Sequence, residues 1–281
     1  LSSKSGAADV LSELGINLDC PFETVQKALN ELGICFLMAP RHHSAMKYVG
    51  PARVELGIRT IFNLLGPLSN PAFVKRQLVG VFDKKWLLPF AEALKKMGST
   101  NAWIVHAKDG LDEVSTTSET YIAQLKNSKI TQFTIAPEQF GIKKTTLNSI
   151  KGGEPKDNAI AFKKLLNGQK GPYRDIVLFN SASAIVATGH ESDFKTAIEM
   201  SEHSVDSGEA SKKLKEAIDK SKHVLKLPDS YSLAIMAGSN TGALEAAMWC
   251  LLGKTGVDIL AWENFGKDWV IDAISQLKLN N

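Results

Sequence analysis

Two adjacent carboxylates, Asp112 and Glu113, are candidates for chemistry in this chain of 281 residues. They follow an apolar run at 101–106, which is typical of a buried strand, and a turn at 108–110. Two hard oxygen donors on a loop beyond a strand end suit Mg²⁺ that bridges to a pyrophosphate. The alternative from these residues alone is a solvated acidic turn. The hydroxyls at 116–118 either join the same loop or cap it.

A second candidate lies at residues 2–9, where Ser3, Ser5 and a glycine precede a helix expected to begin at Ala7. Unpaired backbone N–H groups and the helix dipole favour a phosphate at such an end. The alternative is an ordinary helix cap, which the same residue types provide. This segment alone does not decide between the two.

Arg53 is a candidate for binding a carboxylate, because a guanidinium donates two parallel hydrogen bonds to such a group. It lies in a segment apolar enough to be partly buried, and Arg59 is equally eligible by composition. The neighbouring pair His42 and His43 has no third ligand at a spacing typical of a metal site.

The elements that must position these residues follow an α/β pattern. Strands alternating with helices predict a mostly parallel sheet flanked by helices, and ligands of such sheets sit beyond the carboxyl ends of the strands. The string 57–71 predicts a buried strand followed by a stiff loop. We expect further strands at 34–38 (or an extended segment), 77–82, 101–106, 130–135 and 175–180, and helices at 7–14, from 21, 45–56, 85–97, 181–188 and 194–207.

After residue 207 the character of the sequence changes. We expect a charged amphipathic helix at 210–225, then strands at 231–237 and 257–262 and helices at 241–252 and 269–277. The predicted fold class is therefore α/β, with a small α/β appendage at the C-terminal end; the resemblance described below adds a partial helical lobe.

Composition limits the partners and the compartment. The formal net charge of +3 is small and the basic residues are scattered, so we expect no nucleic acid, and no apolar run is long enough for a membrane span. The cysteines Cys20, Cys35 and Cys250 are too few and too far apart for a disulfide framework, which favours the cytoplasm. Because Leu1 falls within a motif, we expect the chain to begin inside a longer protein.

Four motifs, in their order and spacing, resemble those of the anthranilate phosphoribosyltransferase family. They lie at 3–11, 43–47, 57–71 and 109–115, and the resemblance covers residues 1 to about 209. It implies a fold of the nucleoside phosphorylase and phosphoribosyltransferase type, with the rest of a helical lobe and hinge at 1–70 and an α/β domain at 71–209. It also implies a homodimer, and the transfer of phosphoribosyl from phosphoribosyl pyrophosphate (PRPP) to anthranilate in tryptophan biosynthesis.

The resemblance also implies roles for individual residues. Asp112 and Glu113 match the residues that hold Mg²⁺, Ala7 matches one that contacts PRPP, and Arg53 matches one that contacts anthranilate. No residue is assigned a covalent catalytic role, because orientation and charge stabilisation suffice for this reaction. The remaining expected substrate-binding residues are Ser3 and Ser5 beside the phosphate, and Met38, His43 and Pro67 around anthranilate.

Three motifs of the family would precede Leu1: a Gly-Thr-Gly-Gly-Asp loop, an Asn-x-Ser-Thr segment and a Lys-His-Gly-Asn motif. Because they carry much of the pyrophosphate and anthranilate binding, we expect the chain as given to be impaired. Two alternatives remain open from the sequence. One is an enzyme like pyrimidine nucleoside phosphorylase, which shares the architecture, and the other is a non-catalytic, misjoined fragment.

The segment 210–281 resembles a different family, phosphoserine aminotransferase, in its early part. There a small-residue turn matching Thr241 and Gly242 meets the phosphate of pyridoxal phosphate, and an aromatic residue matching Trp269 stacks on the ring. The region that carries the Schiff-base lysine of that fold is not present. We therefore expect this segment to be vestigial or artificially joined and not to bind pyridoxal phosphate.

Overall fold

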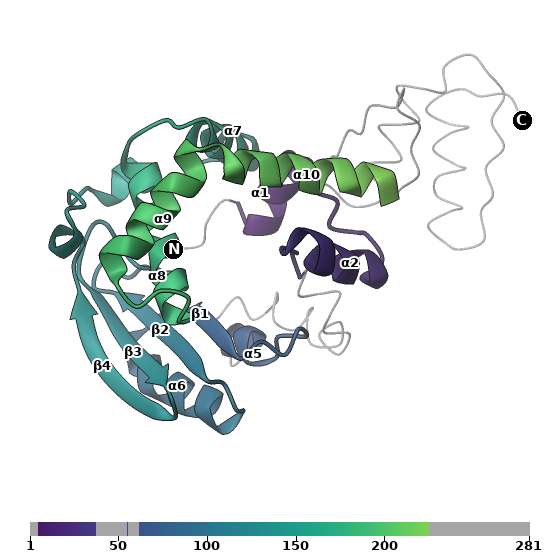
Figure 1. Ribbon diagram of the computed structural model, residues 1–281. Helices are drawn as coiled ribbons and strands as arrows, with labels where there is room; N and C mark the ends of the chain where they lie inside the picture. Colours follow the sequence, from purple (N-terminus) through teal and green to yellow (C-terminus); the bar gives the residue numbers. More distant parts are fainter. Residues whose placement is uncertain (1–4, 38–54, 56–61, 225–281) are drawn as a thin grey trace, which may run out of the picture. The chain divides into compact units, whose positions relative to one another are not determined.

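The computed structural model describes residues 5–37, 55 and 62–224 (Figure 1). The chain divides into two compact units, and every described residue belongs to the first, Leu1–Tyr231. The predicted helix at 45–56, apart from residue 55, and all the elements predicted between 231 and 277 lie outside the described residues. None of the described helices is long and apolar enough to cross a bilayer.

The centre of the described fold is a four-stranded sheet in the order β1-β2-β3-β4. The strands are β1 (Arg76–Gly80), β2 (Asn101–Ala107), β3 (Thr120–Lys126) and β4 (Lys129–Ile135). β1 and β2 pair in parallel, whereas β2–β3 and β3–β4 pair antiparallel. The α/β class with helices flanking a sheet is confirmed, but the described sheet is mixed, and the prediction of a mostly parallel sheet is wrong here.

The antiparallel half of the sheet arises from a strand that the sequence analysis did not predict. β3 and β4 are joined by only Asn127 and Ser128, which have φ angles of 50° and 62°. A two-residue turn with both residues in the left-handed region matches the twist of an antiparallel hairpin, and a parallel crossover needs a far longer connection. The short connection therefore fixes β4 antiparallel to β3.

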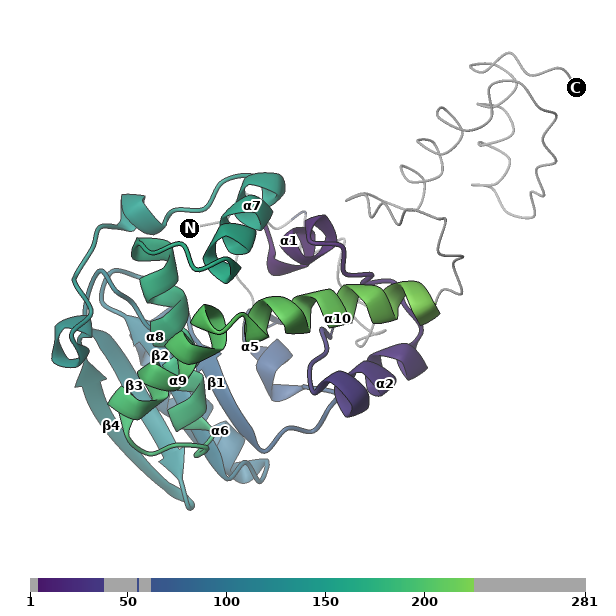
Figure 2. The same ribbon diagram turned by 45° about the horizontal axis from the view of Figure 1, so that its top comes forward.

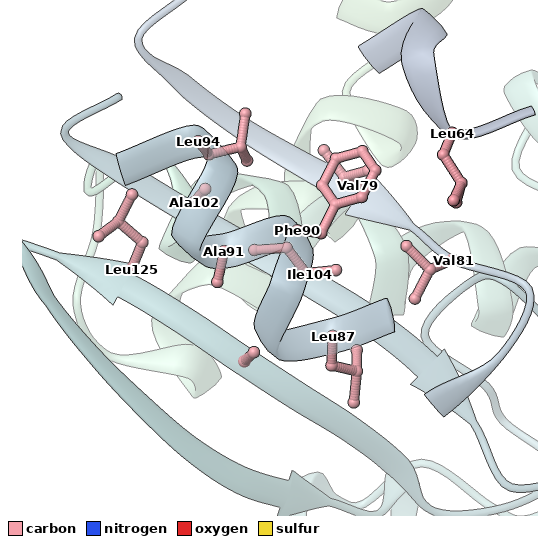
Figure 3. Close-up of a cluster of buried hydrophobic side chains, with 11 residues drawn as sticks. Leu64, Val79, Val81, Leu87, Phe90, Ala91, Leu94, Ala102, Ile104 and Leu125 are labelled. Atoms are coloured by element: carbon pink, nitrogen blue, oxygen red, sulfur yellow. The ribbon is translucent and has the colours of Figure 1, made fainter. Parts of the chain in front are cut away.

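One face of the sheet is covered by α6 (Leu87–Lys96), which follows a 3₁₀ turn at Lys84–Trp86 (Figure 3). The inward residues of α6 are spaced three or four apart, so they form one apolar stripe. They pack on side chains of β1, β2 and β3 and on one residue of α5 (Phe62–Leu68). The buried cluster comprises Leu64, Val79, Val81, Leu87, Phe90, Ala91, Leu94, Ala102, Ile104, Ala123 and Leu125.

The opposite face is covered by α8 (Pro172–Ala187) and α9 (Phe194–Asp206). Successive residues of a strand point to opposite faces, so Trp103 faces α8 and α9 while its neighbour Ile104 faces α6. The Trp103 ring stacks on Phe194 with a centroid separation of 6.0 Å. Both faces of β2 are therefore buried, which makes it a rigid support for the loop that follows it.

The strand predicted at 175–180 is wrong, because these residues lie inside the single helix α8. Pro172 occupies the first turn, where a proline costs no hydrogen bond. Helix α8 buries several sides, so its apolar residues form a continuous run, and such a run does not by itself distinguish a buried strand from a buried helix.

The described N-terminal helices pack beside the end of the α/β layers. They are α1 (Ala7–Glu13) and α2 (Phe22–Leu32), which were both predicted. Helix α10 (Glu209–Val224) contacts α2, α7 (Pro155–Leu166) and α9, while α1 contacts α7 (Figure 2).

Residues 34–37 form no strand, so the strand alternative predicted for 34–38 is wrong over these residues, and residue 38 lies outside the described ones. Two short 3₁₀ turns, Pro137–Phe140 and Leu147–Ile150, lie between β4 and α7.

An ion pair between a buried arginine and an exposed aspartate joins α8 to α9. The Arg174 side chain is only 2% exposed; its Nη1 lies 2.8 Å from Asp206 Oδ1, and its Nη2 donates to Asp206 Oδ2 at 2.9 Å. Lys170 Nζ donates to the same Oδ2 at 3.1 Å. These hydrogen bonds from Lys170 and Arg174 hold the pKa of Asp206 below its ordinary value. The pair fixes the start of α8 against the end of α9.

Candidate functional site

The acidic loop, defined here as residues 108–118, begins where β2 ends. Gly110 N–H donates to the Ala107 carbonyl at 3.0 Å, and Gly110 has a φ of 93°, which favours glycine. This turn carries Asp112 and Glu113 to the carboxyl end of the β1–β2 pair, with both residues exposed to solvent. The predicted position of the acidic pair, on a loop beyond a strand end, is confirmed.

The acidic loop crosses directly over the last residue of β1. A Cβ placed on Gly80 would overlap the carbonyl oxygen of Asp112. Only glycine lets the two backbones approach this closely, so Gly80 fixes the height of the loop above the strand. The sequence analysis did not single out Gly80, although an isolated glycine inside a predicted strand, here 77–82, is a known signal of close backbone approach.

A side chain from α8 holds the same loop from the other side. Asn180 Oδ1 accepts a hydrogen bond from the Val114 N–H at 2.9 Å, and its Nδ2 donates to the Val114 carbonyl at 2.8 Å. The same Nδ2 donates to Ile176 within the helix at 2.9 Å. The sequence analysis also missed Asn180, because its run was assigned to a strand; the signal was a lone amide in an otherwise apolar stretch.

Inside the loop, Asp109 is the hydrogen-bonding centre. Its carboxylate accepts from the Ser115 hydroxyl at 2.6 Å, from the Thr117 hydroxyl, and from Leu111 N–H at 3.1 Å, while its own N–H donates to Ser118 Oγ. Burial alone would raise the pKa of Asp109, but these hydrogen bonds together lower it below its ordinary value. Of the two alternatives for 116–118, Thr117 and Ser118 therefore do supply hydroxyls to the loop.

The two exposed carboxylates differ from Asp109 in their electrostatics. Surrounding protein atoms raise the pKa of Glu113, although part of its side chain reaches solvent, and the adjacent charge of Asp112 raises it further. Tyr173, in the first turn of α8, has its pKa raised by burial and by the charge of Glu113. Negative charge thus accumulates at this loop, and a cation would relieve the repulsion.

The donor set fits Mg²⁺ that is shared with a phosphate. Mg²⁺ in such sites takes one or two carboxylates from the protein and completes its shell with water and substrate oxygens. Asp112 and Glu113 are two such carboxylates, and the described residues contain no cluster of three or more potential ligands. This part of the chain therefore offers a partial shell rather than a closed cation cage.

The other candidate phosphate segment has the geometry of a helix cap. Ala7 begins α1 and is exposed, and the Gly6 N–H donates to the Asp9 carboxylate at 2.8 Å. The acidic side chain therefore satisfies one backbone donor at the same end where a phosphate was predicted. Ser5 is half-buried, and its hydroxyl reaches the Gly6 carbonyl at 3.4 Å. The role of Ala7 and Ser5 in PRPP binding stays a prediction.

Pro67 lies near the end of α5 and is half-buried. The buried strand predicted within 57–71 is wrong over 62–68, which form this helix. A short apolar run has no period of its own to separate helix from strand. The turn that follows agrees with the prediction of a stiff loop, since Asn70 Oδ1 accepts from the Ala72 N–H at 2.9 Å.

The remaining predicted site residues lie outside the described residues. The structure therefore brings Asp112 and Glu113 together with Gly80 and Asn180. On the anthranilate side it places only Pro67, whose role there stays a prediction. The predicted residues outside the described ranges are Ser3, Met38, His43, Arg53, Thr241, Gly242 and Trp269.

The fold and the loop define an α/β protein with a pair of exposed carboxylates on a loop at the end of two parallel strands. Residues 1–211 match the model of the glycosyl transferase family, a/b domain. The match covers most of the chain, so the chain belongs to this glycosyl transferase family.

Individual relatives agree with the family match. The chain is 51% identical over 218 residues to an anthranilate phosphoribosyltransferase of Rhodopseudomonas palustris, covering 78% of the chain and 64% of the relative. It is 56% identical over 210 residues to that of Azospirillum brasilense, covering 75% and 59%. The resemblance predicted over residues 1 to about 209 is thus confirmed. The chain spans less than two thirds of the length of these relatives.

Solved structures show the same similarity. An anthranilate phosphoribosyltransferase from Thermus thermophilus matches with a TM-score of 0.72 and 37% identity, covering 79% of this chain and 65% of that one. The Saccharomyces cerevisiae enzyme in complex with PRPP and Mg matches with a TM-score of 0.71 and 31% identity, covering 79% and 63%. The same yeast enzyme has been solved with 4-fluoroanthranilate.

Proposed function

We propose that this chain carries the α/β part of an anthranilate phosphoribosyltransferase. The amine of anthranilate attacks the anomeric carbon of PRPP, the bond to pyrophosphate breaks, and phosphoribosylanthranilate and pyrophosphate are released. The observation that carries the proposal is the acidic pair at the end of β2, displayed on a chain about half identical to enzymes of that name.

In this proposal each part of the site has one task. Asp112 and Glu113 hold Mg²⁺, which when bound neutralises the charge on the departing pyrophosphate. Arg53 pairs with the carboxylate of anthranilate and orients its amine towards the sugar. Orientation of two substrates, without a covalent intermediate, then supplies much of the rate. The yeast relative bound to PRPP and Mg supports this choice of metal and substrate.

The finer assignments are also proposals. Ala7, Ser3 and Ser5 line the PRPP side, and Met38, His43 and Pro67 line the anthranilate side. We propose the division into 1–70, 71–209 and 210–281, a homodimer, a role in tryptophan biosynthesis and a cytoplasmic location. We further propose that 210–281 descends from a phosphoserine aminotransferase and binds no pyridoxal phosphate through Thr241, Gly242 or Trp269.

One experiment tests the activity and its alternatives together. The chain is incubated with PRPP, Mg²⁺ and anthranilate, and the loss of anthranilate fluorescence is followed; a parallel reaction holds a pyrimidine nucleoside and phosphate. Consumption of anthranilate that requires both Mg²⁺ and PRPP supports the proposal. Cleavage of the nucleoside instead favours the nucleoside phosphorylase alternative. If the chain shows no turnover and no Mg²⁺-dependent binding of PRPP, the result favours the non-catalytic alternative.

Arg53 provides a sharper test of substrate orientation. A charge-assisted hydrogen bond in a partly buried site is worth about 1.5–3 kcal/mol, so Arg53→Ala should weaken anthranilate binding about tenfold or more. Arg59→Ala is the matched control, because composition alone made both arginines eligible. Calorimetry with each substrate separates the roles: PRPP affinity should be unchanged in Arg53→Ala. Equal losses for both substrates would refute the assignment.

A further inference from the structure

We propose that Asn180 is a positioning residue for the acidic pair, acting through the backbone of Val114. The inference rests on the proposed function only in taking Asp112 and Glu113 as the Mg²⁺ ligands. Helix α8 also contacts β1, and each of the two elements touches the loop: β1 through Gly80 and α8 through Asn180. No role at the site follows from the identity of Asn180 alone; the role follows from its contacts.

Both polar atoms of the Asn180 amide are hydrogen-bonded to the backbone of Val114. Its carbonyl oxygen and its amide nitrogen engage the N–H and the C=O of the same residue, Val114, at 2.9 Å and 2.8 Å. This is the pattern that a neighbouring strand would supply, provided here by one side chain. Val114 is 0% exposed, so solvent offers no replacement for either hydrogen bond if the amide is removed.

The two hydrogen bonds between Asn180 and Val114, called the clamp below, act next to the acidic pair. Val114 follows Glu113 directly, and the next residue is also tied down, because the Ser115 N–H donates to Thr120 Oγ1 at 3.0 Å. On the other side, Asp112 is seated against Gly80. The backbone is thus fixed on both sides of Glu113, while the acidic side chains remain exposed. The clamp therefore sets where the two carboxylates lie.

A purely structural explanation of Asn180 is weaker. The neighbours of Asn180 on α8 include Phe179 and Ala182, which are fully buried among apolar side chains. An amide near such a surface is unfavourable unless it is fully hydrogen-bonded, and an apolar side chain would satisfy packing alone. The amide is explained by what it holds. Residues that orient metal ligands from behind typically change metal affinity about 10- to 100-fold when they are removed.

The test compares Asn180→Leu and Asn180→Ala with Ser183→Ala, all in the full chain. Ser183 lies on the same helix and is buried, but its hydroxyl donates only to the Phe179 carbonyl of that helix at 2.7 Å, so its removal leaves the loop untouched. Asn180→Leu retains the branched arrangement of side-chain heavy atoms without the hydrogen bonds, and it serves if the alanine variant does not fold. Two quantities are measured: amide hydrogen exchange over 109–118, and the Mg²⁺ concentration that gives half-maximal binding of PRPP.

We expect both Asn180 variants to speed exchange in the loop about tenfold or more and to raise the Mg²⁺ requirement about tenfold or more. Ser183→Ala should change neither. Loop exchange equal to that of Ser183→Ala would overturn the clamp. Faster exchange with an unchanged Mg²⁺ requirement would overturn the positioning role. If the unmodified chain does not bind PRPP with Mg²⁺, the proposed function fails, and the exchange measurement still decides whether Asn180 holds the loop.

Discussion

The acidic loop and the start of α1 both carry an aspartate among small and hydroxyl residues, yet the structure uses them differently. At α1, Asp9 accepts from the Gly6 N–H and so caps its own helix. In the loop, Asp109 takes the internal hydrogen bonds, and Asp112 and Glu113 remain exposed. The start of α1 uses its acidic group for its own structure, whereas the loop uses one acidic group for its structure and leaves two others exposed.

The supports of the two segments differ in the same way. The loop is fixed from β1 by Gly80 and from α8 by Asn180, which are far from it in sequence. The start of α1 is fixed by a residue three positions away in the same helix. A site that must keep its geometry before a ligand arrives benefits from support by distant, rigid elements. By this criterion the loop is preorganised, whereas the described contacts at the start of α1 are those of a helix cap, and its role in phosphate binding stays a prediction.

The most severe way to break this contrast is to remove the ligand groups themselves. Replacing both Asp112 and Glu113 with alanine should abolish Mg²⁺-dependent binding of PRPP and leave the melting temperature nearly unchanged, because both side chains are exposed. Calorimetry with and without Mg²⁺ measures the binding. Glu119→Ala is the control, since its carboxylate lies 3.7 Å from Lys108 at the edge of the same loop. If the double variant retains Mg²⁺-dependent affinity for PRPP, the solvated acidic turn is the correct interpretation of the pair.

The next largest effect should come from the seat of the loop. Gly80→Ala forces the Asp112 carbonyl away from β1, and overpacking of this kind typically costs about 1–3 kcal/mol. We expect a lower free energy of unfolding in urea and faster hydrogen exchange over 109–118. Gly66→Ala is the control, because no atom lies within 4 Å of a Cβ there. Similar stability of the two variants would show that the loop yields easily.

The ion pair behind α8 offers a pH-dependent test. The folded pKa of Asp206 is lowered, so its contribution is present above the unfolded value, about 3.9, and is lost as pH falls through the folded value. Asp206→Asn should therefore lower the melting temperature at pH 7, and its difference from the unmodified chain should shrink below about pH 4.

Glu138→Gln is the control for this test, because Glu138 Oε1 lies 4.0 Å from Lys144 Nζ in an exposed ion pair. Its melting temperature should differ little from that of the unmodified chain at either pH. A constant difference between Asp206→Asn and the unmodified chain across the acid range would show that Asp206 does not act through its charge.

The smallest effect is expected at α1. Asp9→Ala removes the acceptor for Gly6 N–H, and the loss of such a cap typically costs about 0.5–2 kcal/mol, with exposed sites at the low end. Hydrogen exchange in the acidic loop should be unchanged. Chemical denaturation and exchange are measured on the same samples. A large rise in PRPP affinity on removing Asp9 would instead indicate that its charge had been opposing a phosphate at this end.

The sequence was sufficient where a pattern had one physical explanation. The stripe of α6 and the buried runs of β1 and β2 each have a clear period or a clear boundary, so their positions were predicted closely. The placement of Asp112 followed, because a loop after a buried strand has only one edge of the sheet to occupy. The family resemblance added the identity of the metal and substrates, which periodicity alone does not provide.

The sequence was insufficient where tertiary contacts decide. Residues 175–180 look like a strand because α8 is buried on several sides, and β3 was missed although the Asn127-Ser128 turn marks a hairpin. The partnership of Asn180 with Val114 joins positions 66 residues apart, and no local pattern predicts such a pair. Gly80 became important only once the path of the acidic loop was known.

Two side chains of the single helix α8 hold other parts of the molecule: Arg174 by an ion pair and Asn180 by hydrogen bonds. Near the start of α8, Arg174 pairs with Asp206 at the end of α9. Less than two turns later on the same helix, Asn180 holds the acidic loop. An α-helix rotates about 100° per residue, so the phase between these two side chains is set by the number of residues that separate them. Inserting or deleting one residue between them would turn one of the two side chains away from its partner. We therefore expect α8 to tolerate substitutions between Arg174 and Asn180 far better than any change of length.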